Sequence, residues 1–428
     1  MPFLKISDNR RFLTTQNGDP FFWLADTGWE LIHRLSIEDI EYYFEIRRKQ
    51  GFTVIQVVMI PEQDGLRDPN FYGQVPFKDG NPLFPDETYF SFIDLVIELA
   101  DQKGLVLALL PTWGDKVELM SHGIGPVIFD AQNSFSYGEW IGKRYRNSSN
   151  IIWINGGDRQ GGGDNFKIWN ALAEGIRSAD PNHLMTYHPL GGGYGFSSSK
   201  WFHEARWLDF NMAQSGHVCK GLPNYEIIKA DYERIPVKPC LDGEPRYEDH
   251  AVNWKPDENG WFDDFDVRQA AYWAVFSGAF GHTYGCHPVW QFYDGKRKSV
   301  SFVRRNWKEA LDLPGANQLQ HLKKLILSRD FFSRVPDQSL IADSTMFRNQ
   351  LRATRGKDYA LIYLPAGGEI TVNTVPFNAK LVDSWWFNPS TGATEKTGII
   401  ATSSEMHFEA PASGWGNDWV LGLDFLKE

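Results

Sequence analysis

The sequence predicts an α/β protein, a (β/α)8 TIM barrel followed by a small all-β sandwich domain. Its 428 residues suffice for one large and one smaller domain. Short apolar runs alternate with longer amphipathic segments up to about residue 330, as expected of βα units around a parallel sheet. Near Val335 the pattern changes to short alternating runs separated by Gly, Pro and Asn turns. We therefore expect the barrel over residues 1–334 and the sandwich over residues 335–428.

Eight apolar runs are candidates for the parallel strands, with amphipathic helical patterns between most of them. Eight βα units agree with the ~250 residues that this barrel usually needs. The expected strands are Phe21–Ala25, Thr53–Ile60, Leu105–Pro111, Ile151–Asn155, Leu184–His188, Leu208–Ala213, Pro239–Glu244 and His282–Cys286. The clearest helical patterns are Ile37–Gln50, Phe90–Lys103, Phe166–Ala179 and Val267–Phe280.

Composition excludes several classes of protein. The net charge of -11, without a Lys/Arg stripe, argues against nucleic acid as a partner. The sequence contains no run of about 18 apolar residues, so it predicts no membrane-spanning helix. Three scattered cysteines, Cys219, Cys240 and Cys286, do not form a disulfide framework or a CxxC zinc site. The first residues, MPFLKISDNR, lack a secretory signal, so we expect a cytoplasmic protein unless a signal was removed.

Aromatic residues make up 15% of the chain, and most of them are expected in the core. Some can serve as platforms for sugar rings, because an aromatic face buries apolar area and leaves hydroxyls free to hydrogen-bond. Hydrogen-bonding groups follow every expected strand, at the barrel end where active sites lie, and this lining suits a polyhydroxylated ligand. Asp26 could instead cap the segment after its strand. The candidate substrate-binding residues are Asp26, Trp29, Gln56, Trp113, His188, Gln214, His217, Tyr247, Tyr284 and His287.

Asp158 and Glu244 are the candidate catalytic pair. They follow the fourth and seventh expected strands, and glycoside hydrolysis needs two carboxyl groups that flank the scissile bond. Two glycines before Asp158 allow the backbone to bend sharply towards a ligand. Asp158 could otherwise cap the next helix, a role for which Asp164 is a rival.

Glu244 also has a structural alternative. It could be the buried ion-pair partner of Arg246 or Arg206, and Asp242, two residues earlier on the same face of the strand, competes for its role.

The sequence gives no sign of a metal or cofactor. The first strand reads WLADTGW, without the HxH of barrel metallohydrolases, and we expect His188, His217, His282 and His287 to be neutral hydrogen-bonding groups. There is no GxSxG, GxxxxGK[ST] or HExxH sequence, which removes common serine hydrolase, nucleotide-binding and zinc-protease signatures.

Five motifs in order, FFWLADTGWELIHRLS, RRKQGFTVIQ, PTWG, INGGD and DGEPRYE, resemble the apiosidase-like glycoside hydrolases. The later segments SWWFNPSTGATEK and FEAPASGWGNDWVLGL are similar to the collagen-binding-type β-domain that accompanies that barrel. The resemblance implies a glycosidase that acts on pectic side chains of the plant cell wall, with apiose release as one activity of the family. It also implies that Asp158 matches the family's acid and Glu244 its second carboxylate.

From these residues we expect Asp158 to protonate the glycosidic oxygen while Glu244 attacks the anomeric carbon, with retention of configuration. Carboxyl groups about 5–5.5 Å apart would agree with retention, whereas more than about 6.5 Å would indicate inversion. Two other functions remain open: a non-catalytic protein that binds glycans or matrix, and a barrel lyase or isomerase acting on a sugar acid. The oligomeric state is not predicted.

For the C-terminal domain we expect a stability module packed on the barrel. Its core would contain Trp385, Trp386, Trp415 and Trp419.

Overall fold

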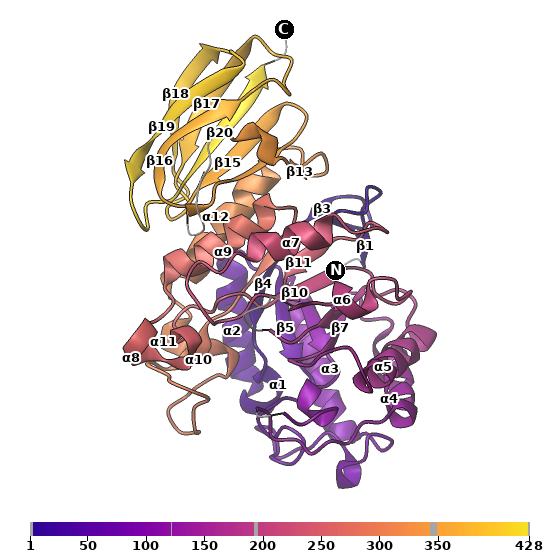
Figure 1. Ribbon diagram of the computed structural model, residues 1–428. Helices are drawn as coiled ribbons and strands as arrows, with labels where there is room; N and C mark the ends of the chain where they lie inside the picture. Colours follow the sequence, from indigo (N-terminus) through magenta and orange to yellow (C-terminus); the bar gives the residue numbers. More distant parts are fainter. Residues whose placement is uncertain (1–2, 121, 192–195, 343–348, 427–428) are drawn as a thin grey trace.

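The computed structural model describes residues 3–120, 122–191, 196–342 and 349–426. It has an N-terminal α/β part and a C-terminal antiparallel β-domain (Figure 1). Helices α9 (Asp264–Phe276) and α12 (Pro314–Leu327) lie between the two. None of the helices in the described ranges is long and apolar enough to cross a membrane.

Parallel strands form the centre of the α/β part. Six make one sheet in the order β12-β4-β5-β6-β7-β8, and β10 pairs in parallel with β11. Each of these eight strands overlaps a run that the sequence predicts as a strand. Their bounds are β4 (Trp23–Thr27), β5 (Val54–Val58), β6 (Val106–Leu110), β7 (Ile151–Gly156), β8 (Met185–His188), β10 (Asn211–Gln214), β11 (Cys240–Asp242) and β12 (Gly281–Tyr284).

Within the described ranges, no continuous ladder joins β8 to β10 or β11 to β12. The hydrogen-bonded sheet is therefore a half-barrel, and the pair β10–β11 lies beside its two edge strands. On one side the Asp209 amide donates to the Met185 carbonyl at 2.8 Å. On the other side the Phe280 amide donates to the Cys240 carbonyl at 3.1 Å. These single backbone bonds lie next to β8 and β12, the two edge strands of the larger sheet.

The parallel strands are apolar because both of their faces are covered. Every residue of β5 and β6 is buried, and their Val, Ile and Leu side chains favour the extended backbone. The helices place their apolar stripes against the strands and their polar faces outward. The remaining helices of this part are α1 (Leu31–Arg34), α2 (Ile37–Lys49), α3 (Glu87–Gln102), α4 (Ala131–Tyr145), α5 (Asn165–Ala179), α6 (Ser199–Phe202), α7 (Asn224–Tyr232), α8 (Pro256–Asn259), α10 (His287–Trp290) and α11 (Trp307–Ala310).

Two small strand groups were not predicted. One is a three-stranded antiparallel sheet near the N-terminus, and the other is the short strand β9 (Phe196–Ser197), which pairs antiparallel with β10. The N-terminal sheet consists of β1 (Leu4–Ile6), β2 (Leu13–Thr15) and β3 (Pro20–Phe21).

The C-terminal domain contains two antiparallel sheets that share one hydrophobic cluster. The larger has the order β13-β14-β15-β20-β17-β18, and the smaller pairs β16 with β19. The strands are β13 (Val335–Pro336), β14 (Arg352–Arg355), β15 (Tyr359–Leu364), β16 (Gly367–Asn373), β17 (Leu381–Phe387), β18 (Thr394–Ala401), β19 (Glu405–Ser413) and β20 (Trp419–Leu426).

Three of the four tryptophans expected in this core are buried: Trp385, Trp386 and Trp419. The expectation for Trp415 is wrong, because its side chain is 48% exposed. Trp415 lies in the turn between β19 and β20 and contacts the ring of Phe265 on α9 edge to face, with ring centroids 4.8 Å apart.

A buried ion pair joins the β-domain to the α/β part. Arg268 of α9 donates from Nη2 to Oδ1 of Asp418 at 2.7 Å and from Nε to Oδ2 at 2.9 Å. The Tyr363 hydroxyl of β15 donates to the same carboxylate at 3.1 Å, and its ring stacks on Tyr272 of α9. Hydrogen bonds and the packing of apolar side chains therefore both hold the two parts in contact.

We expect Asp418→Ala to lower the free energy of unfolding by about 3 kcal/mol, because it leaves the buried Arg268 guanidinium without its main partner. Denaturant titration followed by fluorescence measures this change. Asp383→Ala is the matched control, since the pair of Asp383 with Lys396 is exposed on the lysine side and should contribute about 0–1 kcal/mol. Equal losses in both variants would contradict the assignment of Asp418 as the link.

Candidate active site

A cavity of about 380 Å³ contains both candidate catalytic residues. It lies where the parallel strands β4, β6, β7 and β11 end, since its walls come from the segments that follow them. The lining residues are Trp29, Glu62, Trp113, His122, Asp158, Leu190, Gly191, Gly216, His217, Val218, Glu244, Tyr247, His250, Trp254, His287, Trp290 and Val300.

A glycine turn brings Asp158 into this cavity. Gly156 and Gly157 have φ values of 93° and 109°, and Asp158 itself has a φ of 50°. A Cβ atom on Gly157 would lie 2.8 Å from the Trp113 ring, so a side chain there would clash as well as strain the backbone. Asp164, and not Asp158, occupies the position before α5, although without a side-chain capping bond.

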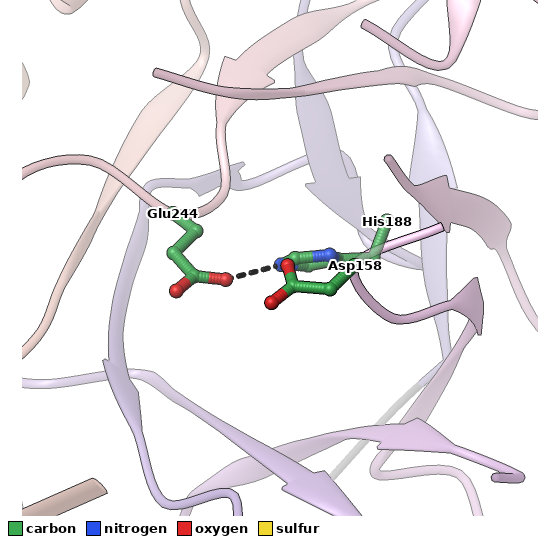
Figure 2. A group of neighbouring side chains, drawn as sticks. All are labelled: Asp158, His188 and Glu244. Atoms are coloured by element: carbon green, nitrogen blue, oxygen red, sulfur yellow. Dashed lines mark ion pairs between the residues drawn. The ribbon is translucent and has the colours of Figure 1, made fainter. Parts of the chain in front are cut away.

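Two histidines hold Glu244 at the other side of the cavity. Glu244 Oε2 lies 2.8 Å from His188 Nε2, and Oε1 lies 3.2 Å from His217 Nε2. Figure 2 shows the first of these ion pairs, with Asp158 beside the imidazole. Tyr247 also interacts with the Glu244 carboxylate through its hydroxyl, which accepts a hydrogen bond from Trp29 Nε1 at 3.1 Å.

Arg246, which the sequence offered as an ion-pair partner of Glu244, and Asp242, its rival for the catalytic role, contact other residues. Arg246 donates from Nη1 to Gln269 at 3.1 Å. Asp242 is buried below the cavity, where it accepts hydrogen bonds from the Ser215 hydroxyl at 2.7 Å and from Asn224 at 3.0 Å. Glu244 is therefore the carboxylate of this strand end that faces the cavity.

The two carboxyl groups are close to each other. One carboxyl oxygen of Asp158, one of Glu244 and one ring nitrogen of His188 all lie within 4.8 Å of one another. These donor types could also take a metal ion. The ion pair between His188 and Glu244 accounts for their proximity without one.

The cavity shifts the pKa values of the two carboxyl groups in opposite directions. Burial and the negative charge of Glu244 raise the pKa of Asp158 above its usual value. Burial acts in the same direction on Glu244, but His188 and His217 outweigh it and lower the pKa of Glu244 to about 2. At neutral pH Glu244 is thus an anion, whereas the pKa of Asp158 is shifted towards the protonated form.

The pKa values of the buried histidines shift in different directions. Burial works against a positive charge on His188, yet Glu244 raises the pKa of His188 above its usual value, which is a shift away from the neutral form that the sequence predicts. Burial lowers the pKa of His282 and of His287 to about 3, and these two agree with the expectation.

The structure brings five of the ten candidate substrate-binding residues to the cavity wall and two more to the catalytic carboxyl groups. His188 supports Glu244, and Gln214 hydrogen-bonds Asp158. The five residues on the wall are Trp29, Trp113, His217, Tyr247 and His287.

The other three candidates lie outside the cavity, so their proposed contact with substrate needs correction. Asp26 neither reaches the cavity nor caps a helix: it is buried against α2, where it accepts from the Tyr43 hydroxyl at 2.6 Å and pairs with Arg47 at 2.5 Å. Tyr284 donates to Glu248 at 2.6 Å. Gln56 donates to the Gly243 carbonyl at 2.9 Å and so links two strand ends across the interior.

Sequence reasoning missed several wall residues. Glu62 lies shortly after the end of β5 and two residues beyond the expected strand end at Ile60, and this position near a strand end is the signal for it. His250 and Trp254 lie in the long segment after Glu244, which has no periodicity that would place it. The missed side chains that offer polar or aromatic groups are Glu62, His122, His250, Trp254 and Trp290.

Comparisons with known proteins show which class of protein this chain resembles over its full length. A solved structure described as "Glycoside hydrolase" is 33% identical, with a TM-score of 0.91 over 100% of this chain and 98% of the other. A glycoside hydrolase family 5 protein from Bacteroides vulgatus ATCC 8482 is also 33% identical, with a TM-score of 0.91 over 99% of this chain and 94% of the other. A family 5 mannosidase from Rhizomucor miehei shares only the fold, at 12% identity and a TM-score of 0.52 over 76% of this chain and 98% of the other. No curated protein sequence matches.

The fold, the paired carboxyl groups and the full-length similarity define this protein as a glycoside hydrolase, an enzyme that acts on carbohydrate. The family model "Apiosidase-like, catalytic domain" matches residues 7–333. The chain therefore belongs to the apiosidase-like family. Residues 335–424 match a second family model, described as "Putative collagen-binding domain of a collagenase".

We expect Asp158→Asn to raise the free energy of unfolding at neutral pH. A carboxyl group whose pKa is raised by folding costs the protein stability above the pKa of the unfolded chain, because the unfolded chain ionises first, and an amide avoids this cost. The gain should be absent below about pH 4, where the carboxyl is protonated in the folded and the unfolded chain, and should grow as the pH rises.

Thermal denaturation at several pH values measures this difference. Asp164→Asn is the control, because Asp164 is exposed in the same loop and its replacement should change stability by less than about 0.5 kcal/mol. A destabilised Asp158→Asn protein at pH 7 would contradict the electrostatic description of the cavity.

Proposed function

We propose that this glycoside hydrolase cleaves its substrate by a two-carboxylate mechanism with retention of configuration. The observation that carries the proposal is the pair Asp158 and Glu244 in one cavity, with carboxyl oxygens within 4.8 Å and opposite pKa shifts. Retaining enzymes place these groups about 5–5.5 Å apart, whereas inverting enzymes need about 6.5–9.5 Å to admit a water molecule.

Each carboxyl group then has one task in each step. Protonated Asp158 donates to the glycosidic oxygen while the Glu244 carboxylate attacks the anomeric carbon, so that the C–O bond breaks and a glycosyl ester forms. Asp158, now ionised, removes a proton from water, which attacks the same carbon and frees Glu244. The proton gained by Asp158 restores the starting state.

The lining of the cavity favours a neutral sugar. Among the described residues that line it, none is lysine or arginine, so the carboxylate of a uronic acid would find no cation fixed for it. We propose a neutral residue from a pectic side chain, apiose among the candidates, as the sugar that occupies the cavity. The two parallel sheets would act together as one closed (β/α)8 barrel over residues 1–334, and the sandwich over residues 335–428 would support it.

Trp254 provides an aromatic surface at the entrance. Its side chain is 47% exposed, although it lines the cavity, and it packs edge to face against His217 and His250. A sugar ring that stacks on Trp254 would bury apolar area and leave its hydroxyls to the histidines.

The decisive experiment measures sugar release from a panel of aryl glycosides and pectic oligosaccharides. Glu244→Gln should reduce kcat by at least about 10³-fold, because an amide is not a nucleophile at this carbon. Asp158→Asn should lose about 10²–10⁴-fold, and less on aryl glycosides whose leaving group needs no proton. Proton NMR of the first product should show the anomeric configuration of the substrate.

The outcomes separate the rival functions. If Glu244→Gln releases as much sugar as the wild type, the assignment fails. A glycan-binding protein would bind without turnover in either form, and a lyase would produce an unsaturated ring that absorbs in the ultraviolet. A chelator control tests metal dependence: we expect unchanged activity, and its loss would contradict the two-carboxylate mechanism.

We expect Trp254→Ala to raise KM about 5- to 10-fold, with a much smaller change in kcat, because stacking acts equally on the bound substrate and the transition state. Steady-state kinetics on the best substrate of the panel measures both constants. Trp415→Ala is the matched control, since Trp415 is equally exposed but lies on the β-domain. An unchanged KM in Trp254→Ala would exclude the stacking role.

A further inference from the structure

A third carboxyl group, Glu62, faces the same cavity as Asp158 and Glu244. It lies in the segment that follows β5, between the loops that follow β4 and β6. The two-carboxylate mechanism gives it no task. Glu62 is half-buried, and this cavity holds no lysine or arginine among its described lining residues that could pair with its carboxylate.

The segment that carries Glu62 is held from both sides by groups other than the Glu62 carboxyl. The Ile60 carbonyl accepts from the Trp113 amide at 3.1 Å, on the loop after β6. The Gln63 amide donates to Glu30 Oε1 at 3.1 Å, on the loop after β4. The Glu62 side chain is therefore presented to the cavity by a fixed backbone, and it does not itself fasten the loop.

A close turn adds to this fixation. A Cβ atom on Gly65 would lie 2.7 Å from Cδ of Pro61, so the chain folds back tightly over the residue before Glu62. The Pro61 carbonyl also accepts from Lys116 Nζ at 3.4 Å. The position of Glu62 is thus set before any ligand enters.

The charged groups around Glu62 are mainly carboxylates. Asp158, Asp115 and Glu30 face it from the loops after β7, β6 and β4, and together with burial they raise the pKa of Glu62 to about 8. Among the described residues, Gln63 Nε2 donates a hydrogen bond to its carboxyl, at 3.2 Å.

The neighbouring cations are engaged with other partners. Lys116 Nζ lies 2.7 Å from Asp115, His33 lies 2.8 Å from Glu30, and Arg34 lies 3.5 Å from Glu30.

His122, also on the cavity wall, contacts Arg159 at 3.1 Å through its ring. No lysine or arginine among the described lining residues is thus fixed on the Glu62 carboxyl, and its raised pKa of about 8 favours protonation.

We propose that Glu62 binds the substrate as a neutral carboxylic acid, donating its O–H to an oxygen of the sugar next to Asp158. This inference rests on the proposed function and adds a specificity-determining residue to it. A protonated carboxyl both donates and accepts a hydrogen bond, and can therefore recognise one hydroxyl group in a fixed position. It also keeps a further negative charge away from the pair that performs the chemistry.

The proposal predicts how substrate binding depends on pH. As the pH rises through about 8, Glu62 ionises, loses its donor and repels Asp158 and Glu244. KM should therefore rise on the alkaline side. Glu62→Gln keeps an N–H donor that cannot ionise, so it should bind substrate nearly as well as the wild type at pH 6 and should lack the alkaline rise in KM.

Three variants and one probe test this. The probe is the p-nitrophenyl glycoside that the wild type cleaves fastest, with kcat and KM measured from pH 5.5 to 9.5. We expect KM to increase about 5- to 10-fold in Glu62→Leu, with kcat changing less, and to stay within about twofold of the wild type in Glu62→Gln at pH 6. Glu118→Gln is the matched control, because Glu118 pairs with Asn165 at 2.6 Å outside the cavity.

Thermal denaturation checks the ionisation without any ligand. Glu62→Gln should be more stable than the wild type at pH 9 but nearly equal to it at pH 4, because a raised pKa costs stability as the pH rises from the pKa of the unfolded carboxyl, about 4, to that of the folded one, about 8. An unchanged KM in Glu62→Leu, or an alkaline rise in KM that persists in Glu62→Gln, would overturn the proposal and leave the hydrolase assignment intact.

Calorimetric titration with the p-nitrophenyl glycosides distinguishes a failure of the proposed function from a failure of the role proposed for Glu62. If the wild type binds a glycoside but releases no sugar, the proposed function fails, and the affinities of Glu62→Leu and Glu62→Gln still decide the role of Glu62. If the wild type neither binds nor cleaves any of them, both proposals are wrong.

Discussion

The charge on Glu244 is the constraint on which the rest of the cavity depends. A buried carboxylate must be compensated, and here two imidazoles do so in a wall without lysine or arginine among the described lining residues. Once this anion is fixed, a second carboxyl group nearby is favoured in its protonated form. The difference between the acid Asp158 and the anion Glu244 therefore follows from which of them the histidines contact.

The sequence allows much of this arrangement to be predicted. The β-rich runs identify all eight parallel strands, because strands covered on both faces are almost continuously apolar. Tandem glycines before Asp158 indicate a turn that only glycine tolerates, and the structure places the Trp113 ring against Gly157. The family resemblance, carried by five ordered motifs, is confirmed by the family model that matches residues 7–333.

What the sequence could not show is the direction of single side chains at a strand end. Neighbouring residues of a strand face opposite sides, so a shift of one position separates a wall residue from one under a helix. Asp26 points to Arg47 of α2 for this reason, whereas Trp29, three residues later, reaches the cavity. Glu62 and Trp254 lie on segments without periodicity, where contacts between loops decide the position.

The β-domain and the substrate cavity are connected through one helix. The segment that carries His250 and Trp254 ends at α9, whose first turn is closed by a capping box from Asp263 and Asp266. One turn further on, Arg268 pairs with Asp418 of the β-domain. The β-domain is therefore paired with the helix that follows the segment lining the cavity.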